Sequence, residues 1–303
     1  MDNVEAKELG QPVSPWRGWG PIILFPLAVL IFTPEDWPRW VYMWLLAFVI
    51  FAGCKWLTWR RTPAPAARWW QHAGYLFAWP GLNAGAFLSS ELLPDKDQPS
   101  LREWCLAIFR LIGGIVLFWV VAARISDNHE ILAGWVGMTG LILMLHFGAF
   151  QLLSCGWRSV GIDAQPLMKR PLASTSLSEF WSRRWNTAFR DFTHRFLFRP
   201  LSRWFGPRWA ILIGFVFSGI IHDLVISVPA GGGYGGPTIF FGAQAAGIFL
   251  ERSRACRAAG LGHGWRGWLF AMIILTLPVY GLFHPPFVRN IILPFMRALR
   301  ALR

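Results

Sequence analysis

The histidine with the clearest chemical context is His222, which lies beside Asp223 in the apolar stretch WAILIGFVFSGIIHDLVISV. Ionisable side chains are costly inside a bilayer and usually face an interior cavity. At helical spacing Gly214, Ser218 and His222 share one face, so small side chains leave space beside the imidazole. Because histidine titrates near neutral pH, this pattern predicts that His222 acts as a general base.

Two other histidines have weaker contexts. His146 also lies in an apolar stretch, GLILMLHFGAF, but it has no acidic neighbour. We therefore expect His146 to form a hydrogen bond that links two membrane helices. His129, in SDNHE, lacks the ligand spacing of a metal site, and the four cysteines are scattered without a CxxC pair. The sequence predicts neither a metal site nor a disulfide framework.

The composition indicates which elements must position these residues. Of the 303 residues, 54% are hydrophobic, 15% are charged and 20 are Trp. This composition is typical of an integral membrane protein. Several windows approach the ~20 apolar residues that cross a bilayer, and none alternates like a β-barrel strand. The sequence therefore predicts an all-α, polytopic integral membrane protein. The expected spans lie near residues 20–33, 40–57, 105–123, 132–154, 209–228, 237–250 and 267–283.

The basic residues predict the orientation of these spans. Lys and Arg are concentrated in 58–104 and 155–208, which the positive-inside rule places in the cytoplasm, whereas 229–236 has none. Seven spans would place the basic C-terminal tail on the other side, so a further or re-entrant span near 78–92 or 286–299 is an alternative. We expect about seven to nine transmembrane helices in all.

Other broad features limit the function classes. The first 20 residues lack the features of a removable signal peptide, so we expect none. The net charge is +13, but the basic residues form no block typical of a nucleic-acid-binding module, and we expect no nucleic-acid partner. The chain is expected to form a single membrane-embedded domain over residues 1–303.

The 155–208 segment predicts an additional helix. Ser176 and Glu179 have capping-box spacing, and aromatic side chains then recur at helical intervals until Pro200. We expect one amphipathic helix that lies at the cytoplasmic interface or dips into the protein. Its polar face would carry Arg183, Asn186, Arg190 and Thr193.

Four blocks of sequence carry a family resemblance. The runs FWSRRWN (Phe180 to Asn186) and SGIIHDL (Ser218 to Leu224) resemble the wax synthase branch of the membrane-bound O-acyltransferase family. YLFAWPGLNAGAFL and PTIFF with Gln244 resemble two further blocks of that branch, and the four together span about 75–250. The resemblance implies that Asn186 and His222 form the catalytic pair. The supporting residues would be Asp223, Ser218, Trp185 and Gln244.

Two features differ from the plant members of the branch. Those members usually have Glu where this chain has Asp223, and the GGGYGG loop (231–236) is richer in glycine than theirs. The basic and glycine-rich details resemble bacterial members. The resemblance therefore implies a location in a bacterial inner membrane and leaves the alcohol acceptor open.

Acyl transfer to a hydroxyl fits these residue types. The attack of a hydroxyl on a thioester needs a base and a donor for the developing oxyanion. His222 would be the base, and the Asn186 amide would donate to the acyl carbonyl or orient the imidazole. No GxSxG nucleophile motif occurs, so direct transfer is favoured over an acyl-enzyme. The resemblance implies acyl-CoA as co-substrate, a hydroxyl-bearing acceptor and no cofactor.

The arginines of the predicted amphipathic helix have two interpretations. The acyl-CoA phosphates would be bound by Arg183, Arg184, Arg190 and Arg195. Alternatively, these charges follow the positive-inside rule and hold the helix against anionic lipid. Both interpretations stay open.

Two other functions remain as alternatives. One is an O-acyltransferase of the same superfamily that acts on a sugar, a glycan or a secreted small molecule. The other is a proton-coupled transporter or flippase, in which His222 and Asp223 would form a proton relay. The absence of repeat symmetry in the sequence disfavours the transporter.

Overall fold

The expected spans all form helices. The computed structural model describes residues 18–64, 66–91 and 93–302, which contain helices and no strand, so the all-α prediction is confirmed for this part of the chain. The expectation about a signal peptide falls largely on residues 1–17, outside the described residues. The long helices are α1 (Gly20–Phe32), α2 (Arg39–Arg60), α5 (Leu101–Val116), α6 (Glu130–Ile142), α7 (Phe150–Ser159), α10 (Arg199–His222), α12 (Gly236–Glu251) and α14 (Gly264–Thr276).

Five helical stretches among the described residues are long and apolar enough to cross a membrane. One of them, Thr187–Ala230, is kinked at Gly206, whose φ of 81° is not helical. α1 and α12 have only 13 and 16 residues. At 1.5 Å per residue they measure about 20 and about 24 Å, against a hydrocarbon core of about 30 Å. They nevertheless pack along α2 and α10, respectively. The five stretches are Arg39–Arg60, Leu101–Arg124, Asp127–Ser159, Thr187–Ala230 and Gly264–Leu282.

The outward faces of these helices are apolar. Large hydrophobic side chains that would be buried in a water-soluble protein are exposed along them, as expected where lipid is the solvent. Examples are Leu24, Ile31, Phe48, Phe109, Ile112, Trp209, Ile220 and Ile239.

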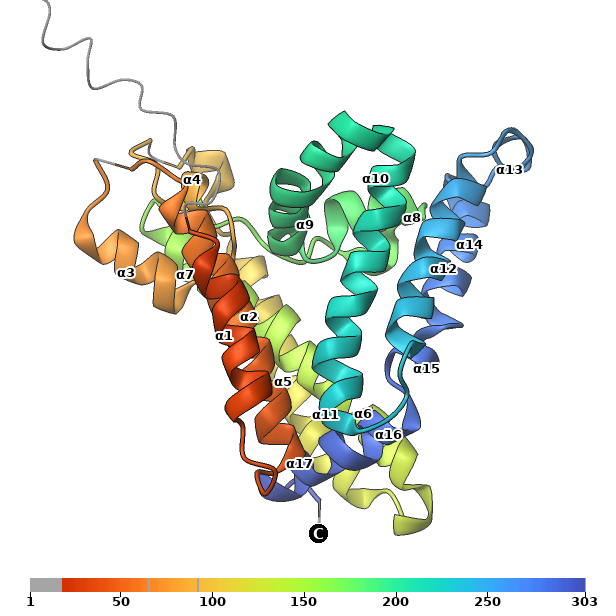
Figure 1. The fold of residues 1–303 in the computed structure, drawn as a ribbon. Helices are drawn as coiled ribbons and strands as arrows, with labels where there is room; N and C mark the ends of the chain where they lie inside the picture. The colour runs from red at the N-terminus through yellow and green to blue at the C-terminus, as the bar shows by residue number, and fades with distance from the viewer. Residues whose placement is uncertain (1–17, 65, 92, 303) are drawn as a thin grey trace, which may run out of the picture.

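The loops divide between two ends of the bundle (Figure 1). α3 (Trp69–Ala78), α4 (Ala84–Phe87), α8 (Leu177–Glu179), α9 (Thr187–Thr193) and α13 (Arg254–Ala258) lie at one end. The loop between α11 (Val228–Ala230) and α12, together with the C-terminus, lies at the other. The two basic segments, 58–104 and 155–208, thus share one end, as the charge pattern predicts.

Neither residues 78–91 nor residues 286–299 belong to the five stretches that are long and apolar enough to cross a membrane. Among residues 79–91, which follow α3, the structure describes one helix, the four-residue α4. The 286–299 region forms α16 (Pro285–Phe287), the π-helical η11 (Val288–Ile292) and α17 (Leu293–Ala298), which pack against α2 and α6. Val288, Ile291 and Met296 are fully buried there. The C-terminal segment therefore contributes to the hydrophobic core.

Small residues let the helices approach closely. A Cβ on Gly114 of α5 would lie 2.6 Å from the carbonyl oxygen of Gly140 on α6. Likewise, a Cβ on Gly219 of α10 would lie 2.6 Å from the Cα of Thr238 on α12. Such contacts are typical of membrane helices, where close van der Waals packing drives association. The second contact fixes α12 beside the end of α10 that carries His222.

Candidate active site

His222 ends α10 with one ring nitrogen already bonded. Its Nδ1 lies 2.7 Å from the carbonyl oxygen of Ser218, one turn earlier. A carbonyl only accepts hydrogen bonds, so Nδ1 carries the proton, and in the neutral ring Nε2 has a free lone pair. Ser218 therefore supports His222 through its backbone, not through the hydroxyl. The part-buried imidazole has the tautomer that a general base needs.

The predicted amphipathic helix is not a single helix. α8 continues as π-helical η8 (Phe180–Arg184), and the helix stops at Trp185, which is extended. Asn186 is left-handed, with φ 43°, and is the N-cap of α9. The predicted continuous helix is therefore wrong at these two residues. The prediction that Pro200 ends the helix is also wrong, because Pro200 lies in the first turn of α10.

Contacts with an upstream segment explain the break. The backbone N–H of Thr187 donates to Leu167 O at 3.0 Å, and that of Lys169 donates to Arg184 O at 2.8 Å. The backbone N–H of Asn186 points to the sulfur of Met168, 3.2 Å away. These long-range bonds replace the intrahelical ones, and asparagine tolerates the left-handed conformation.

The FWSRRWN segment lies between two histidine-bearing helices. On one side Trp181 packs against Phe241 of α12, with ring centroids 5.7 Å apart, and Phe241 lies 4.5 Å from His222. On the other side Trp185 stacks on His146, with centroids 6.3 Å apart and an interplanar angle of 14°. The segment thus joins both intramembrane histidines through aromatic contacts.

His146 does not form the hydrogen bond expected from the sequence. It lies in the π-helical η6 (Leu143–Ala149), and its buried Nδ1 has no hydrogen-bond partner in the described part of the chain. Its recorded contacts are with the rings of Phe150 and Trp185. The expectation of an interhelical hydrogen bond is therefore wrong for the described residues, and the His146 ring instead stacks on Trp185.

Asn186 and His222 are not joined by a hydrogen bond among the described residues. The Asn186 side-chain oxygen accepts from the backbone N–H of Phe189 at 3.4 Å, which caps α9. That bond leaves the amide NH₂ as the donor of this side chain. The two predicted catalytic residues therefore come from separate elements, and a substrate between them would be needed to connect them.

Asp223 organises the end of the site opposite the basic loops. Its carboxylate accepts hydrogen bonds from Ser227 Oγ and the Gly235 N–H, each at 2.8 Å, and from the Thr238 N–H at 3.1 Å and the Thr238 hydroxyl. These donors join η10 (Asp223–Ser227), the glycine-rich loop and α12. Asp223 thus holds the helix end that carries His222 against α12.

His284 extends this network and was not anticipated from the sequence. It is 5% exposed, and its Nδ1 accepts from the Phe287 N–H at 3.1 Å. Nε2 therefore carries the proton and donates to Ser227 Oγ, 3.2 Å away. Burial lowers the pKa of His284 below its usual value, which keeps the ring neutral. The sequence feature that indicates a close neighbour here is the run of three glycines, Gly231 to Gly233. A Cβ on Gly233 would lie 2.2 Å from the His284 ring.

Two other side chains on α12 fix the surrounding elements. Gln244 is fully buried, and its Nε2 donates to the carbonyl oxygen of Ile274 on α14 at 2.8 Å. Glu251, which the sequence analysis did not single out, accepts from the backbone N–H groups of Leu177 and Ser178 at 2.7 and 2.8 Å. This buried carboxylate binds the N-terminus of α8, where a helix favours negative charge. Glu251 thereby positions the start of the FWSRRWN segment.

Three of the four predicted phosphate-binding arginines have protein partners. Arg184 pairs with Glu179 at 2.7 Å, Arg190 pairs with Asp191 at 2.7 Å, and Arg195 donates to the carbonyl oxygen of Arg61 at 3.0 Å. Burial alone would raise the pKa of Glu179, but donation from the Thr175 N–H and Arg184 holds that pKa below its usual value. Arg183 is exposed, and no ion pair of its side chain occurs within the described chain.

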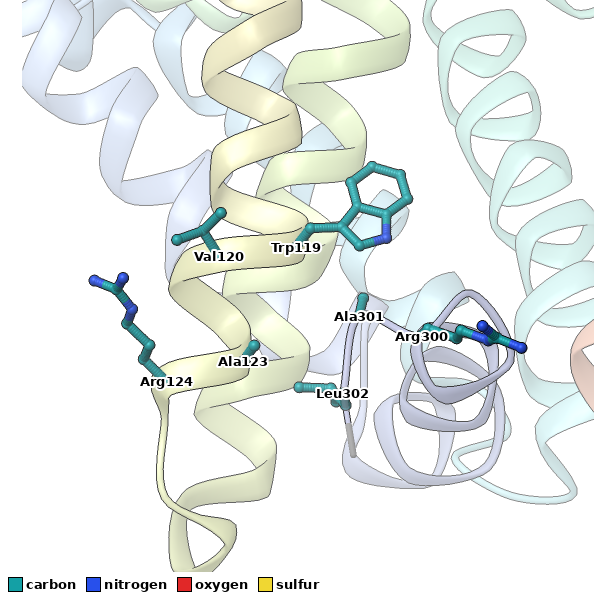
Figure 2. Close-up of a pocket in the computed structure, with 7 residues that line it drawn as sticks. All are labelled: Trp119, Val120, Ala123, Arg124, Arg300, Ala301 and Leu302. Carbon is teal, nitrogen blue, oxygen red and sulfur yellow. The ribbon is translucent and has the colours of Figure 1, made fainter.

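Two surface pockets lie away from His222. One, of about 360 Å³, is lined by Trp119, Arg124 and Arg300 at the end that carries the C-terminus (Figure 2). The other, of about 640 Å³, lies between α10 and α12 and includes Arg208, Trp209 and Arg252. Among the described residues, no group of three His, Cys, Asp or Glu side chains is arranged to hold a metal ion.

Comparisons with known proteins match the region of the sequence that contains this site. Residues 164–242, which include Asn186 and His222, match the model of the membrane bound O-acyl transferase family. A long-chain-alcohol O-fatty-acyltransferase of Simmondsia chinensis is 38% identical over 171 residues, 48% of this chain and 47% of that protein. An acyl-CoA–sterol O-acyltransferase of Arabidopsis thaliana is 31% identical over 71 residues, 21% of each chain. The matched regions thus cover less than half the length of these relatives.

Proposed function

We propose that this chain transfers an acyl group from acyl-CoA to the hydroxyl of an acceptor, because residues 164–242 match the model of the membrane bound O-acyl transferase family. The observation that carries the proposal is the bond from His222 Nδ1 to Ser218 O, which leaves Nε2 as an available base. His222 is linked to the FWSRRWN segment through Phe241, which contacts both the imidazole and Trp181. The favoured acceptor is a long-chain alcohol, because the similar protein of Simmondsia chinensis is named for that substrate.

The reaction we propose proceeds without an acyl-enzyme. His222 Nε2 accepts the proton of the acceptor hydroxyl while the hydroxyl oxygen attacks the thioester carbonyl carbon. The resulting oxyanion is stabilised by hydrogen-bond donors, for which the Asn186 amide is the first candidate. The carbon–sulfur bond then breaks, and the imidazolium returns its proton to the departing thiolate. The products are an ester and free CoA, so acyl-CoA is a co-substrate and no further cofactor enters the scheme.

We assign the donor to the end of the bundle that carries the basic segments 58–104 and 155–208, taken as the cytoplasmic side. Acyl-CoA is a cytosolic metabolite with several phosphates, and exposed Arg183 lies at that end within the FWSRRWN segment. The location proposed for the chain is the inner membrane of a bacterium, because the glycine-rich loop and the basic residues resemble bacterial members of the family.

A direct assay tests this function. Purified protein is incubated with radiolabelled acyl-CoA and a panel of long-chain alcohols, sterols and sugars, and ester and free thiol are both measured. We expect ester and thiol in equal amounts with an alcohol acceptor. The sterols are included because one similar protein is named for a sterol acceptor. Thiol release without ester, or no turnover with any acceptor, would refute the proposal.

A further inference from the structure

The indole N–H of Trp181 is a buried hydrogen-bond donor without an acceptor. Its Nε1 is inaccessible to solvent and has no partner within the described chain. A tryptophan indole only donates, and an unpaired donor in an apolar interior carries a desolvation penalty. Such groups call for an explanation, and a substrate acceptor atom that arrives in the site supplies one.

Trp181 has a fixed position relative to the proposed base. Its ring packs on Phe215 of α10 at 5.5 Å and on Phe241 of α12 at 5.7 Å. Phe241 in turn lies 4.5 Å from His222. Phe215 and His222 are two turns apart on the same face of α10. Trp181 and His222 are therefore separated by a single phenyl ring at the junction of α10, α12 and η8.

This separation fits the geometry of acyl transfer. The base lies about 3 Å from the hydroxyl oxygen, that oxygen lies about 3 Å from the carbonyl carbon, and a donor lies about 3 Å from the carbonyl oxygen. The base and the oxyanion donor of such a site are thus several ångströms apart, with the substrate between them. A substrate that lies along the Phe241 ring would contact both the imidazole and the indole, because both of these rings pack on it.

We propose that Trp181 is a catalytic residue whose indole N–H donates a hydrogen bond to the carbonyl oxygen of the acyl donor as that oxygen becomes an oxyanion. This role rests on the proposed function. No bond to Trp181 forms or breaks, and its proton stays on the indole nitrogen. The free indole donor complements the Asn186 amide, so the FWSRRWN segment supplies both stabilising groups.

Trp44 provides a matched control. Its Nε1 is also buried without a hydrogen-bond partner in the described residues, but it lies on α2, where its ring packs on Phe295 at 5.7 Å. Replacement by Phe removes the same donor from both positions and keeps an aromatic ring. Trp181 packs on the ring that contacts His222, whereas no ring contact of Trp44 with Phe241 or His222 occurs among the described residues.

The test compares Trp181→Phe with Trp44→Phe in the purified full chain. We expect Trp181→Phe to lower kcat by roughly 10²–10³, the usual loss for one oxyanion donor, and to leave KM for acyl-CoA within about twofold. Trp44→Phe should keep kcat. Equal kcat values for the two variants, or a Trp181→Phe effect on thermal stability alone, would overturn the proposal. An inactive wild-type protein would instead refute the proposed function and this role with it.

A second variant covers the case in which Trp181→Phe folds poorly. Genetic incorporation of 3-benzothienylalanine at position 181 keeps the bicyclic shape and replaces the N–H with sulfur. The same loss of kcat is expected from this substitution. Wild-type kcat in a folded protein with that side chain would show that the N–H has no part in the reaction.

Discussion

The Nδ1 proton of His222 is bound by the backbone carbonyl oxygen of Ser218, 2.7 Å away. This bond selects one tautomer and aims the remaining lone pair away from the helix axis. Since the acceptor is a backbone atom, a substitution of the Ser218 side chain leaves the bond in place. Substitutions of Ser218 and His222, which share one face of α10, are therefore expected to differ sharply in their effects on activity.

Replacement of His222 by Ala should abolish ester formation, whereas Ser218→Ala should retain it. Loss of a general base lowers the rate by roughly 10²–10⁴. His146→Phe is the histidine control, because it keeps the aromatic contact with Trp185, and we expect it to stay active. Initial rates with labelled acyl-CoA measure all three variants. Activity in His222→Ala together with its loss in His146→Phe would move the base to the other helix.

Gly219→Ala should destabilise the protein, and Gly214→Ala should not. A Cβ at Gly219 would lie 2.6 Å from Thr238 Cα, whereas one at Gly214 would lie 4.0 Å from its nearest neighbour, Leu197 Cδ2. Overpacking of this kind costs about 1–3 kcal/mol. Thermal unfolding in detergent measures the difference. Equal melting temperatures for the two variants would show that α10 and α12 are farther apart than the structure places them.

Asp223→Asn should loosen the helix end and the glycine-rich loop together. The amide that replaces the carboxylate loses acceptor capacity for the Ser227, Gly235 and Thr238 donors, and such charged hydrogen bonds contribute about 1.5–3 kcal/mol each. Limited proteolysis within 231–236 and the melting temperature report the change. Ser159→Ala, which loses only a bond to Cys155 O within α7, is the control. Unchanged proteolysis of Asp223→Asn would contradict the network.

The neighbouring Arg183 and Arg184 should have separate roles. Arg183→Gln should raise KM for acyl-CoA about fivefold, which corresponds to about 1 kcal/mol for an exposed charge contact, and should reduce the salt dependence of KM. Arg184→Gln should lower stability, because Arg184 holds Glu179 and the carbonyl oxygens of Lys169 and Arg170. Steady-state kinetics at two ionic strengths and thermal unfolding separate the two effects. A wild-type KM in Arg183→Gln would show that Arg183 does not bind acyl-CoA and contributes only to the orientation of the protein in the membrane.

Cysteine labelling tests the predicted sidedness. Ser174 is fully buried, so an exposed neighbour is the better probe for that segment: Leu172 is 74% exposed, and Tyr234 in the opposite loop is 66% exposed. In a background with Cys105 and Cys256 replaced by Ser, an impermeant maleimide added to intact cells should label Tyr234→Cys and not Leu172→Cys. The reverse pattern would place the basic loops outside and exclude cytosolic acyl-CoA as the donor.

The sequence alone predicts the helices and most of the chemistry. Each expected span coincides with a helix, because an apolar run of spanning length is a local property. His222 stands out for a similar reason, since an ionisable group within such a run is costly wherever the fold places it. The arrangement of loops at two ends also follows from the distribution of Lys and Arg.

The tertiary structure decides the features that depend on distant segments. Asn186 leaves the helix because residues 167–169 supply its neighbours with other backbone partners. His284 joins Ser227 across 57 positions of sequence, and Trp181 faces His222 only through Phe241 of a later helix. Helical periodicity shows which residues share a face of one helix, but not what that face meets. The sequence therefore singles out His222 as the proposed base, and only the packing of α10, α12 and η8 determines the residues around it.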